Sequence, residues 1–335
     1  MARALKGAVR DHLAASLATV GITDPRVCAR DRLSIATFHR VLPAELKAMY
    51  PLPGLCVTPE ELSFFLAYFT ERYTVGPLRD VWTRWRAGER PRRPFLALTF
   101  DDAERDNFVY ARPVLRRWDV RASFYAPVDH VERATPIWHD RLGFALLNAF
   151  RQPSLPEPLR RLWGPATPSL KTLGVAMEIT KLLTPEERDE LTASLPDEVP
   201  AWAALMSWAE LRALHQDGHE VASHSMTHAL LPPLSGDALR YEIATSKERL
   251  EAAIDAPVTT FCYPNGDANE RVAQEVEDAG YACAVTTRWG SNASGSNPYL
   301  LQRCDMHADH ARDRRGALSE ARVALRMSGL QPSLR

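Results

Sequence analysis

Four side chains in this chain of 335 residues could together bind a metal ion: His224, His228, Asp101 and Asp102. The two histidines are four residues apart, so both imidazoles can face one point if the backbone makes a helical turn between them. The two aspartates directly follow a compact apolar run, residues 96–100. Adjacent carboxylates at the end of a buried strand are unfavourable unless they meet a cation or take part in proton transfer. Imidazole and carboxylate suit zinc and its neighbours in the transition series.

Each pair also has a purely structural interpretation. Histidines at this spacing can lie on an exposed turn, and two aspartates can cap the helix that follows a strand. The elements predicted around both pairs favour a functional role over a purely structural one. Residues 218–222 alternate after a glycine and predict a strand that ends just before His224, while residues 96–100 predict a strand that ends at Asp101. Both pairs would then lie at strand ends, where α/β folds place their active sites.

The two motifs, Thr-Phe-Asp-Asp at 99–102 and His-Ser-Met-Thr-His at 224–228, resemble the first two motifs of the polysaccharide deacetylases, the NodB-homology carbohydrate esterases. The resemblance covers about residues 33 to 303. It implies an α/β fold, a distorted (β/α)7 barrel, here with an N-terminal helix and a helical insertion. It also implies a divalent metal, Zn²⁺ with Co²⁺, Ni²⁺ or Fe²⁺ as alternatives, on three ligands: Asp102, His224 and His228.

The resemblance also assigns an acid and a base. Asp101 corresponds to the family's catalytic base. Residues 33–38 predict a strand that ends in the step Phe38-His39. Some branches of the family look circularly permuted and carry an N-terminal strand with such a step, whose histidine is the general acid. His39 is therefore the candidate acid, although its spacing alone favours a half-buried histidine bound to backbone.

The third family motif, Arg-x-Pro-Tyr-Gly, is only partly kept as Cys-Tyr-Pro-Asn-Gly. Cys262 stands at the arginine position and Asn265 at the tyrosine position. A backbone donor survives a side-chain replacement, so the Asn265 N–H remains the candidate oxyanion donor. Arg303 is the candidate replacement for the missing arginine, and Tyr263 and Trp289 are candidates for binding the sugar.

The remaining histidines are ambiguous. His307 and His310, with Asp305 and Asp309, could form a second metal site, but such clusters are more often solvated turns. We expect His139 to be structural.

Composition narrows the function classes. The formal net charge of −1 gives no electrostatic case for nucleic acid or for an anionic membrane surface. Five cysteines without a Cys-x-x-Cys spacing argue against disulfides and predict a reducing, cytoplasmic location. No apolar run reaches the length of a membrane span. Residues 1–20 are apolar at helical spacing, but Asp11 and His12 interrupt any signal-peptide core. They predict an amphipathic helix packed on the domain, with peripheral membrane contact as the alternative.

Four segments follow from these patterns: an N-terminal helical extension (1–30), a catalytic domain (31–315), a proline-interrupted helical insertion within it (136–207), and a C-terminal surface helix and tail (316–335). The predicted function is metal-dependent removal of an N-acetyl group from an N-acetylhexosamine unit of a polysaccharide or a carrier-linked glycan precursor. The departures at Cys262 and in the late motifs keep one alternative open, a saccharide-binding protein of the same fold that has lost turnover.

Overall fold

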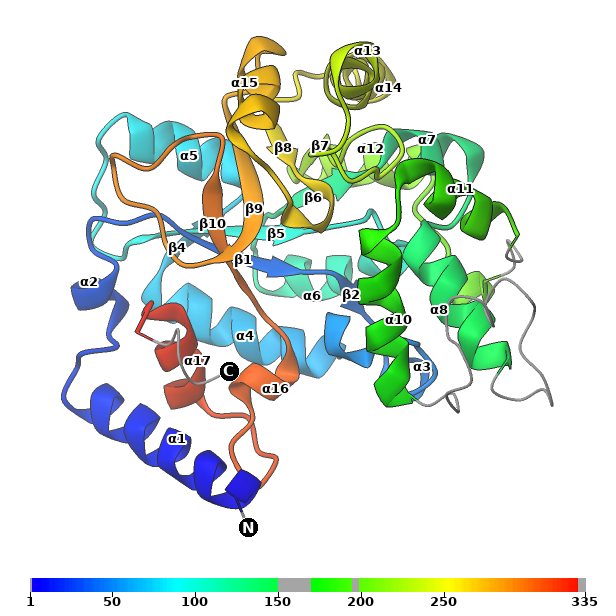
Figure 1. The fold of residues 1–335 in the computed structure, drawn as a ribbon. Helices are drawn as coiled ribbons and strands as arrows, with labels where there is room; N and C mark the ends of the chain where they lie inside the picture. Colours follow the sequence, from blue (N-terminus) through cyan, green and yellow to red (C-terminus); the bar gives the residue numbers. More distant parts are fainter. Residues whose placement is uncertain (1, 150–169, 195–198, 331–335) are drawn as a thin grey trace.

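The computed structural model describes residues 2–149, 170–194 and 199–330 of the chain (Figure 1). Its centre is a barrel in which each strand pairs in parallel with the next and β1 pairs with both β10 and β5. The barrel strands, in order around the ring, are β1 (Ser34–Phe38), β5 (Phe95–Phe100), β6 (Ser123–Ala126), β7 (Glu220–Ser223), β8 (Thr260–Cys262), β9 (Cys283–Trp289) and β10 (Leu301–Asp305). This closed ring of seven strands confirms the predicted (β/α)7 barrel.

Strand β5 shows how the sequence orients the barrel. Phe95 and Ala97 belong to an apolar cluster with residues from all the other barrel strands, which marks the interior. Leu96, Leu98 and Phe100 belong to the cluster that packs against the outer helices. Because successive side chains on a strand point to opposite faces, residues of odd number on β5 point inward up to its end.

Helices cover the outside of the barrel. Those that follow or precede the strands are α4 (Pro59–Arg72), α5 (Leu78–Arg86), α6 (Arg112–Arg117), α7 (Val128–Arg133), α12 (Trp208–Gln216), α14 (Ser246–Ile254) and α15 (Glu270–Asp278). Capping boxes at Thr58 and Ser207 start α4 and α12. Short elements complete the chain: α2 (Pro25–Cys28), α3 (Ala44–Lys47), α13 (Gly236–Arg240), α16 (Ala308–Ala311), and the strands β2 (Arg40–Val41), β3 (Cys56–Val57) and β4 (Thr74–Gly76).

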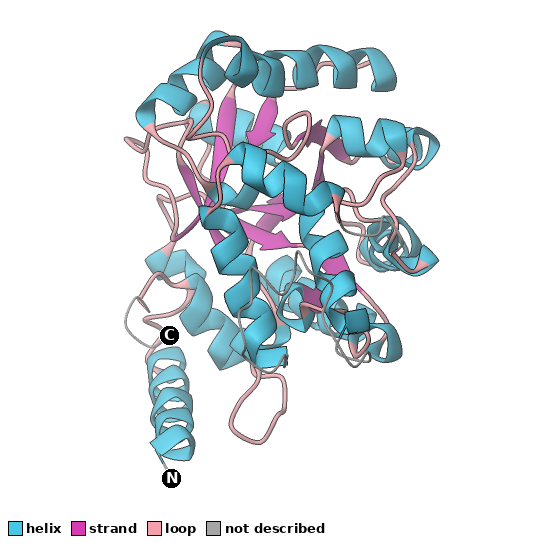
Figure 2. Ribbon diagram, turned by 45° about the vertical axis from the view of Figure 1, so that its right-hand side comes forward, coloured by secondary structure: helices cyan, strands magenta, loops and turns pink. Residues whose placement is uncertain are grey.

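The insertion between β6 and β7 consists of α8 (Trp138–Ala149), α10 (Leu170–Leu182) and α11 (Pro185–Ala193) in the described residues (Figure 1). Figure 2 shows helices around the central strands in a second view. These helices share a small apolar core of their own, which includes Leu142, Leu146 and Leu173. The prolines that we expected to interrupt the insertion, between residues 153 and 168, lie outside the described part of the chain.

Two predictions about the ends of the chain are wrong in part. The C-terminal helix α17 (Glu320–Met327) is buried instead of lying on the surface, because helix α1 (Ala2–Thr19) packs against it. Helix α1 does not use its predicted apolar stripe for this contact: Ala14 is fully buried, whereas Val9 and Leu13 are exposed. Within the described residues, no helix is long and apolar enough to cross a membrane.

Candidate functional site

A cleft of about 1070 Å³ opens at the carboxyl edge of the barrel and gathers nearly every predicted site residue. The predicted residues in its lining are His39, Asp101, Asp102, His224, His228, Tyr263, Asn265 and Trp289. Arg303 lies beneath this surface. Leu173 and Met177 of α10 add a wall, so the insertion shapes access to the cleft.

The three predicted metal ligands converge on one point. The Nε2 atoms of His224 and His228 each lie 3.2 Å from Oδ1 of Asp102. Two ligands of a tetrahedral zinc ion, each bound at about 2.0–2.1 Å, are ~3.3 Å apart, so these separations suit a shared cation. The carbonyl of Cys262 accepts a hydrogen bond from Nδ1 of His224 at 2.8 Å, which directs Nε2 toward the metal position. The imidazole and carboxylate donors therefore fit a zinc-like ion.

Left-handed backbone turns bring these ligands together. Asp102 has φ 73°, and Ser225 and His228 have φ 65° and 54°. The loop between the histidines is thus irregular, not the helical turn that their spacing suggested. Glu242 holds this loop, because its carboxylate accepts hydrogen bonds from the backbone N–H of Met226 at 3.0 Å and of Thr227 at 2.9 Å. Such strained conformations persist only where surrounding contacts fix them.

Asp101 has a different partner from Asp102. Asp101 lies two residues after the inward-facing Thr99, just beyond the end of β5. Arg303 binds both carboxylate oxygens of Asp101, at 2.8 and 2.7 Å. Both side chains are almost fully buried. Burial alone would raise the pKa of Asp101, but the Arg303 guanidinium holds it below its usual value. The Sγ atom of Cys262, which stands at the arginine position of the motif, lies 3.6 Å from Oδ2 of Asp101.

His39 lies next to this ion pair because β1 and β5 are neighbours. The N–H of Asp101 donates to the carbonyl of Phe38 at 3.1 Å, which places the ends of the two strands together. His39 Nε2 is 3.8 Å from Asp101 Oδ2, and the imidazole is 18% exposed to the cleft. Asn107 donates to the His39 carbonyl at 2.8 Å and fixes the backbone there.

Arg40 organises a network that the sequence analysis missed. Its guanidinium is fully buried and pairs with Asp106 at 2.6 Å, with Glu104 at 2.7 Å and with Asp140. These carboxylates come from the loop after β5 and from α8 of the insertion, so one side chain joins both to the end of β1. The hydroxyl of Tyr50 donates to Asp140 at 2.6 Å. Only the position of Arg40 beside His39 could have drawn attention to it.

The turn after β8 carries the candidate oxyanion donor. Asn265 has φ 58° and lines the cleft, and Thr287 donates to its carbonyl at 3.0 Å. The next residue must be glycine, since a Cβ on Gly266 would lie 2.1 Å from Thr287 Oγ1. The Tyr263 hydroxyl donates to the carbonyl of Tyr299 at 2.8 Å, and the whole side chain is buried, so Tyr263 supports the wall of the cleft and does not present its ring to a ligand.

Three further histidines lie in the cleft. The sequence favoured a structural role for His139, yet its Nε2 lies 3.8 Å from Asp102 Oδ2. His307 and His310 form a second group with Asp305, whose candidate donor atoms lie within 4.8 Å of one another. All three residues of that group are half-buried, so it is less exposed than the solvated turn that we expected.

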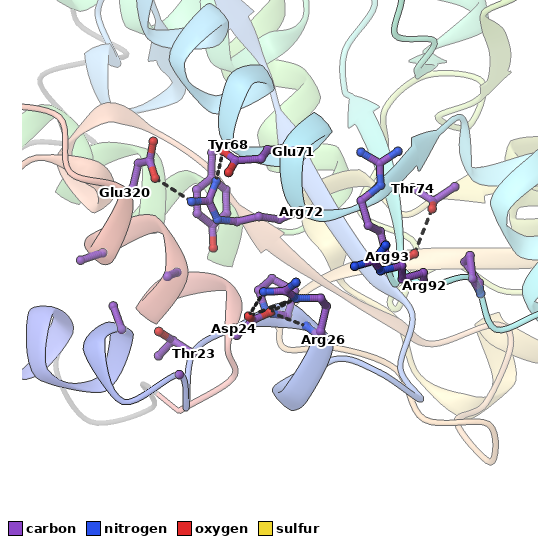
Figure 3. Close-up of a pocket in the computed structure, with 16 residues that line it drawn as sticks. Thr23, Asp24, Arg26, Tyr68, Glu71, Arg72, Thr74, Arg92, Arg93 and Glu320 are labelled. Atoms are coloured by element: carbon purple, nitrogen blue, oxygen red, sulfur yellow. Dashed lines mark hydrogen bonds and ion pairs between the residues drawn. The ribbon is translucent and has the colours of Figure 1, made fainter.

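A second hollow, of about 740 Å³, lies beside α4 and α17 (Figure 3). Two of its arginines are engaged by carboxylates of the same hollow: Arg26 pairs with Asp24, and Arg72 pairs with Glu71 and Glu320. Arg93 donates to the backbone carbonyl of Thr70. The predicted site residues line the cleft at the barrel edge and not this hollow, so that cleft remains the candidate site.

Comparison with known proteins identifies the family to which this chain is similar. Residues 88–284, more than half of the chain, match the family model described as polysaccharide deacetylase. The Bacillus subtilis protein YxkH, named as a polysaccharide deacetylase, is 29% identical over 94 residues, 28% of this chain. The match spans only 34% of the length of that relative.

Solved structures show the same fold. Streptococcus pyogenes deacetylase PplD, in complex with acetate, has a TM-score of 0.60 at 18% identity, over 88% of this chain and 98% of that one. A polysaccharide deacetylase from Bacillus cereus has a TM-score of 0.55 at 18% identity, over 88% and 69% of the two chains. IcaB from Ammonifex degensii has a TM-score of 0.55 at 14% identity, over 89% and 97%.

Proposed function

Because the chain belongs to the polysaccharide deacetylase family, we propose that it is a metal-dependent hydrolase that removes the N-acetyl group from an N-acetylhexosamine unit of a saccharide. The observation that carries this proposal is the different environment of two adjacent carboxylates. Asp102 faces two imidazole nitrogens at 3.2 Å, whereas Asp101 faces Arg303 and His39. One carboxylate is thus arranged to bind a cation and its neighbour to move a proton.

In the proposed reaction, Asp102, His224 and His228 would hold the cation. Zn²⁺, or Co²⁺, Ni²⁺ or Fe²⁺ on the same donors, would supply Lewis-acid chemistry that lowers the pKa of water and polarises the acetyl carbonyl. Asp101 accepts the proton of the attacking water. Arg303 keeps the Asp101 carboxylate ionised and orients both of its oxygens.

The remaining groups act on the acetyl carbonyl and the leaving amine. The Asn265 N–H donates to the oxyanion that develops as water adds to the carbonyl. His39 then donates a proton to the departing nitrogen, because an unprotonated amine is a poor leaving group. The ring of Trp289, which is partly exposed in the cleft, offers an apolar face to the sugar.

Acetate release tests this proposal directly. Metal-loaded wild type should release acetate from a panel of N-acetylhexosamine substrates, and Asp101→Asn and His39→Ala should each lower kcat by at least ~100-fold while metal content stays unchanged. The matched controls are Asp119→Asn and His12→Ala, which change exposed residues and should leave kcat unaltered. Saccharide binding and bound metal without acetate release by wild type would instead support the binding-protein alternative. Wild type that binds no metal would refute the proposal.

The proposal also includes the kind of saccharide substrate and the cellular compartment of the enzyme. Five free cysteines, four of them buried, support a reducing compartment and hence a cytoplasmic enzyme. A cytoplasmic enzyme would meet a carrier-linked precursor more readily than a finished polymer. The substrate panel should therefore include both forms, and a higher kcat/KM on the polymer would contradict the carrier-linked acceptor.

A further inference from the structure

The loop after β10 carries a second group of metal-ligating side chains. Asp305 is the last residue of β10, His307 is the N-cap of the short helix α16, and His310 lies within that helix. One donor atom of each residue lies within 4.8 Å of the other two, and all three residues line the same cleft as Asp102. The group shares no residue with the Asp102 site, so it would hold an ion of its own.

The backbone places both imidazoles on one side of the turn. The N–H of His310 donates to the carbonyl of His307 at 3.0 Å, and residues three apart on a helical turn are neighbours. The centroids of the two rings are 3.6 Å apart, and their planes are tilted by 41°.

The carboxylate of Asp305 reaches the same point. Its Oδ2 lies 3.9 Å from Nε2 of His307, which is too long for a hydrogen bond but suits two donors on one ion. Two ligands bound at about 2.1 Å lie ~3.3 Å apart in a tetrahedron and ~4.2 Å apart across an octahedron. The observed separation falls between these limits.

A backbone carbonyl orients the imidazole of His310. Its Nδ1 lies 3.2 Å from the carbonyl oxygen of Asp305, and because a carbonyl oxygen only accepts, Nδ1 is the donor. Histidines that bind metals commonly donate their other ring nitrogen to a backbone carbonyl in this way, which directs Nε2 toward the ion. His224 of the first site makes the same kind of contact, with the carbonyl of Cys262.

A cation at this position would have an arginine as a neighbour. Arg326 donates through Nε and Nη2 to the backbone carbonyl of Asp305, at 3.3 and 3.2 Å. The guanidinium thus contacts the backbone of Asp305, whereas the carboxylate faces His307. Asp309 also lines the cleft and adds a negative charge that offsets the arginine. Because its donors are half-buried and a guanidinium is close, we expect this site to bind an ion more weakly than the Asp102 site does.

We propose that Asp305, His307 and His310 form a second divalent-metal site at the carboxyl edge of the barrel. Two imidazoles and one carboxylate suit Zn²⁺, Co²⁺ or Ni²⁺. Three protein ligands leave coordination positions open, and because the group lines the cleft, these positions can take water or an oxygen of a bound saccharide. The inference goes beyond the proposed function, since no step of the proposed deacetylation uses this ion.

The number of bound ions gives the first test. Metal-free wild type, titrated with Zn²⁺ in a calorimeter, should bind two ions per chain. Asp102→Asn and the double variant His307→Ala/His310→Ala should each bind one. His12→Ala, which changes an exposed histidine of α1, should bind two ions as wild type does. One ion in wild type, or a second ion retained by the double variant, would overturn the proposal.

Anomalous diffraction identifies the ligands directly. Crystals of wild type grown with two equivalents of Zn²⁺ should show one anomalous peak at the Asp102 site. A second peak should lie about 2.0–2.2 Å from ring nitrogens of His307 and His310 and from the Asp305 carboxylate. Crystals of Asp102→Asn should keep this second peak. A second peak away from these three residues, or no second peak, would overturn the assignment.

These measurements are independent of turnover. If wild type binds two ions at the assigned residues but releases no acetate, the second site stands and the proposed function fails. If wild type releases acetate with a single ion at the Asp102 site, the proposed function stands and the second site is excluded.

Discussion

The ion pair between Arg303 and Asp101 allows a quantitative test of how the barrel interior supports chemistry. The substitution Arg303→Met keeps a long apolar side chain and leaves the Asp101 carboxylate buried without its partner. Opposite charges in contact interact by about 4 kcal/mol at the effective dielectric constant that describes protein sites. Removing one member of a buried pair costs about 3–5 kcal/mol, since the remaining charge is stranded. We therefore expect Arg303→Met to lower the free energy of unfolding by about 3–5 kcal/mol.

Urea denaturation followed by tryptophan fluorescence measures this loss. The matched control is Arg249→Met, because Arg249 also contacts both oxygens of one carboxylate, Glu132, but at an exposed site. That variant should lose at most about 1 kcal/mol. If stranded charge is the cause, adding Asp101→Asn to Arg303→Met should restore about 2 kcal/mol. A loss in Arg303→Met no larger than in the control would refute the reasoning.

The same pair predicts a pH dependence. The folded pKa of Asp101 lies below its usual value, so the stabilisation is fully present above the unfolded pKa of about 3.9 and is lost as pH falls through the folded pKa. In Arg303→Met, burial acts without the compensating charge, and the pKa of Asp101 should rise. The acid limb of the kcat/KM profile should then move to higher pH. An unchanged acid limb would show that Asp101 is not the base.

Three further outcomes are expected. Gly266→Ala should lower the free energy of unfolding by about 1–3 kcal/mol and reduce kcat at unchanged metal content, because the new Cβ would overlap Thr287. Trp289→Ala should raise KM by about tenfold with little change in kcat if its ring only binds the sugar, and a fall in kcat alone would contradict that role. Chelation should lower the stability of wild type by about 4 kcal/mol relative to protein in free metal at a thousand times its dissociation constant. Asp102→Asn should respond little to the chelator in the same thermal melts.

Local sequence patterns were enough to predict the barrel and much of the cleft. Apolar runs such as residues 96–100 end abruptly in polar residues, and each such end marks the carboxyl edge of a strand. The capping boxes at Thr58 and Ser207 involve residues only three apart, so the sequence displays them completely. Since the strands are parallel, polar groups that follow different strands had to meet at one edge.

The features of the fold and the site that the sequence did not predict depend on contacts between residues far apart in the chain. The apolar, strand-like sequence before Arg303 ends at Leu301, but β10 continues to Asp305, and only that extension makes Arg303 point inward with Leu301. Helix α17 carries charges typical of a surface helix, yet Arg322 lies 3.3 Å from Asp11 under the cover of α1. His139 is separated from Asp102 by a strand and two helices, and no local pattern links them.

The charge balance around the cleft explains why these distant contacts matter. Five buried carboxylates lie near the cleft: Asp101, Asp102, Glu104, Asp106 and Asp140. In the described part of the chain, Arg303 pairs with Asp101, and Arg40 pairs with Glu104, Asp106 and Asp140. Burial raises the pKa of Glu104 well above its usual value, yet the other four carboxylates still outnumber the two guanidinium groups. Uncompensated charge of this kind is strongly unfavourable in a protein interior. A divalent cation at Asp102 would remove most of the excess. Arg40→Met should lower stability, but it removes a positive charge from carboxylates near Asp102, so on electrostatic grounds it should not weaken zinc binding. Weaker zinc binding by the folded variant would instead show that Arg40 positions the loop that carries Asp102.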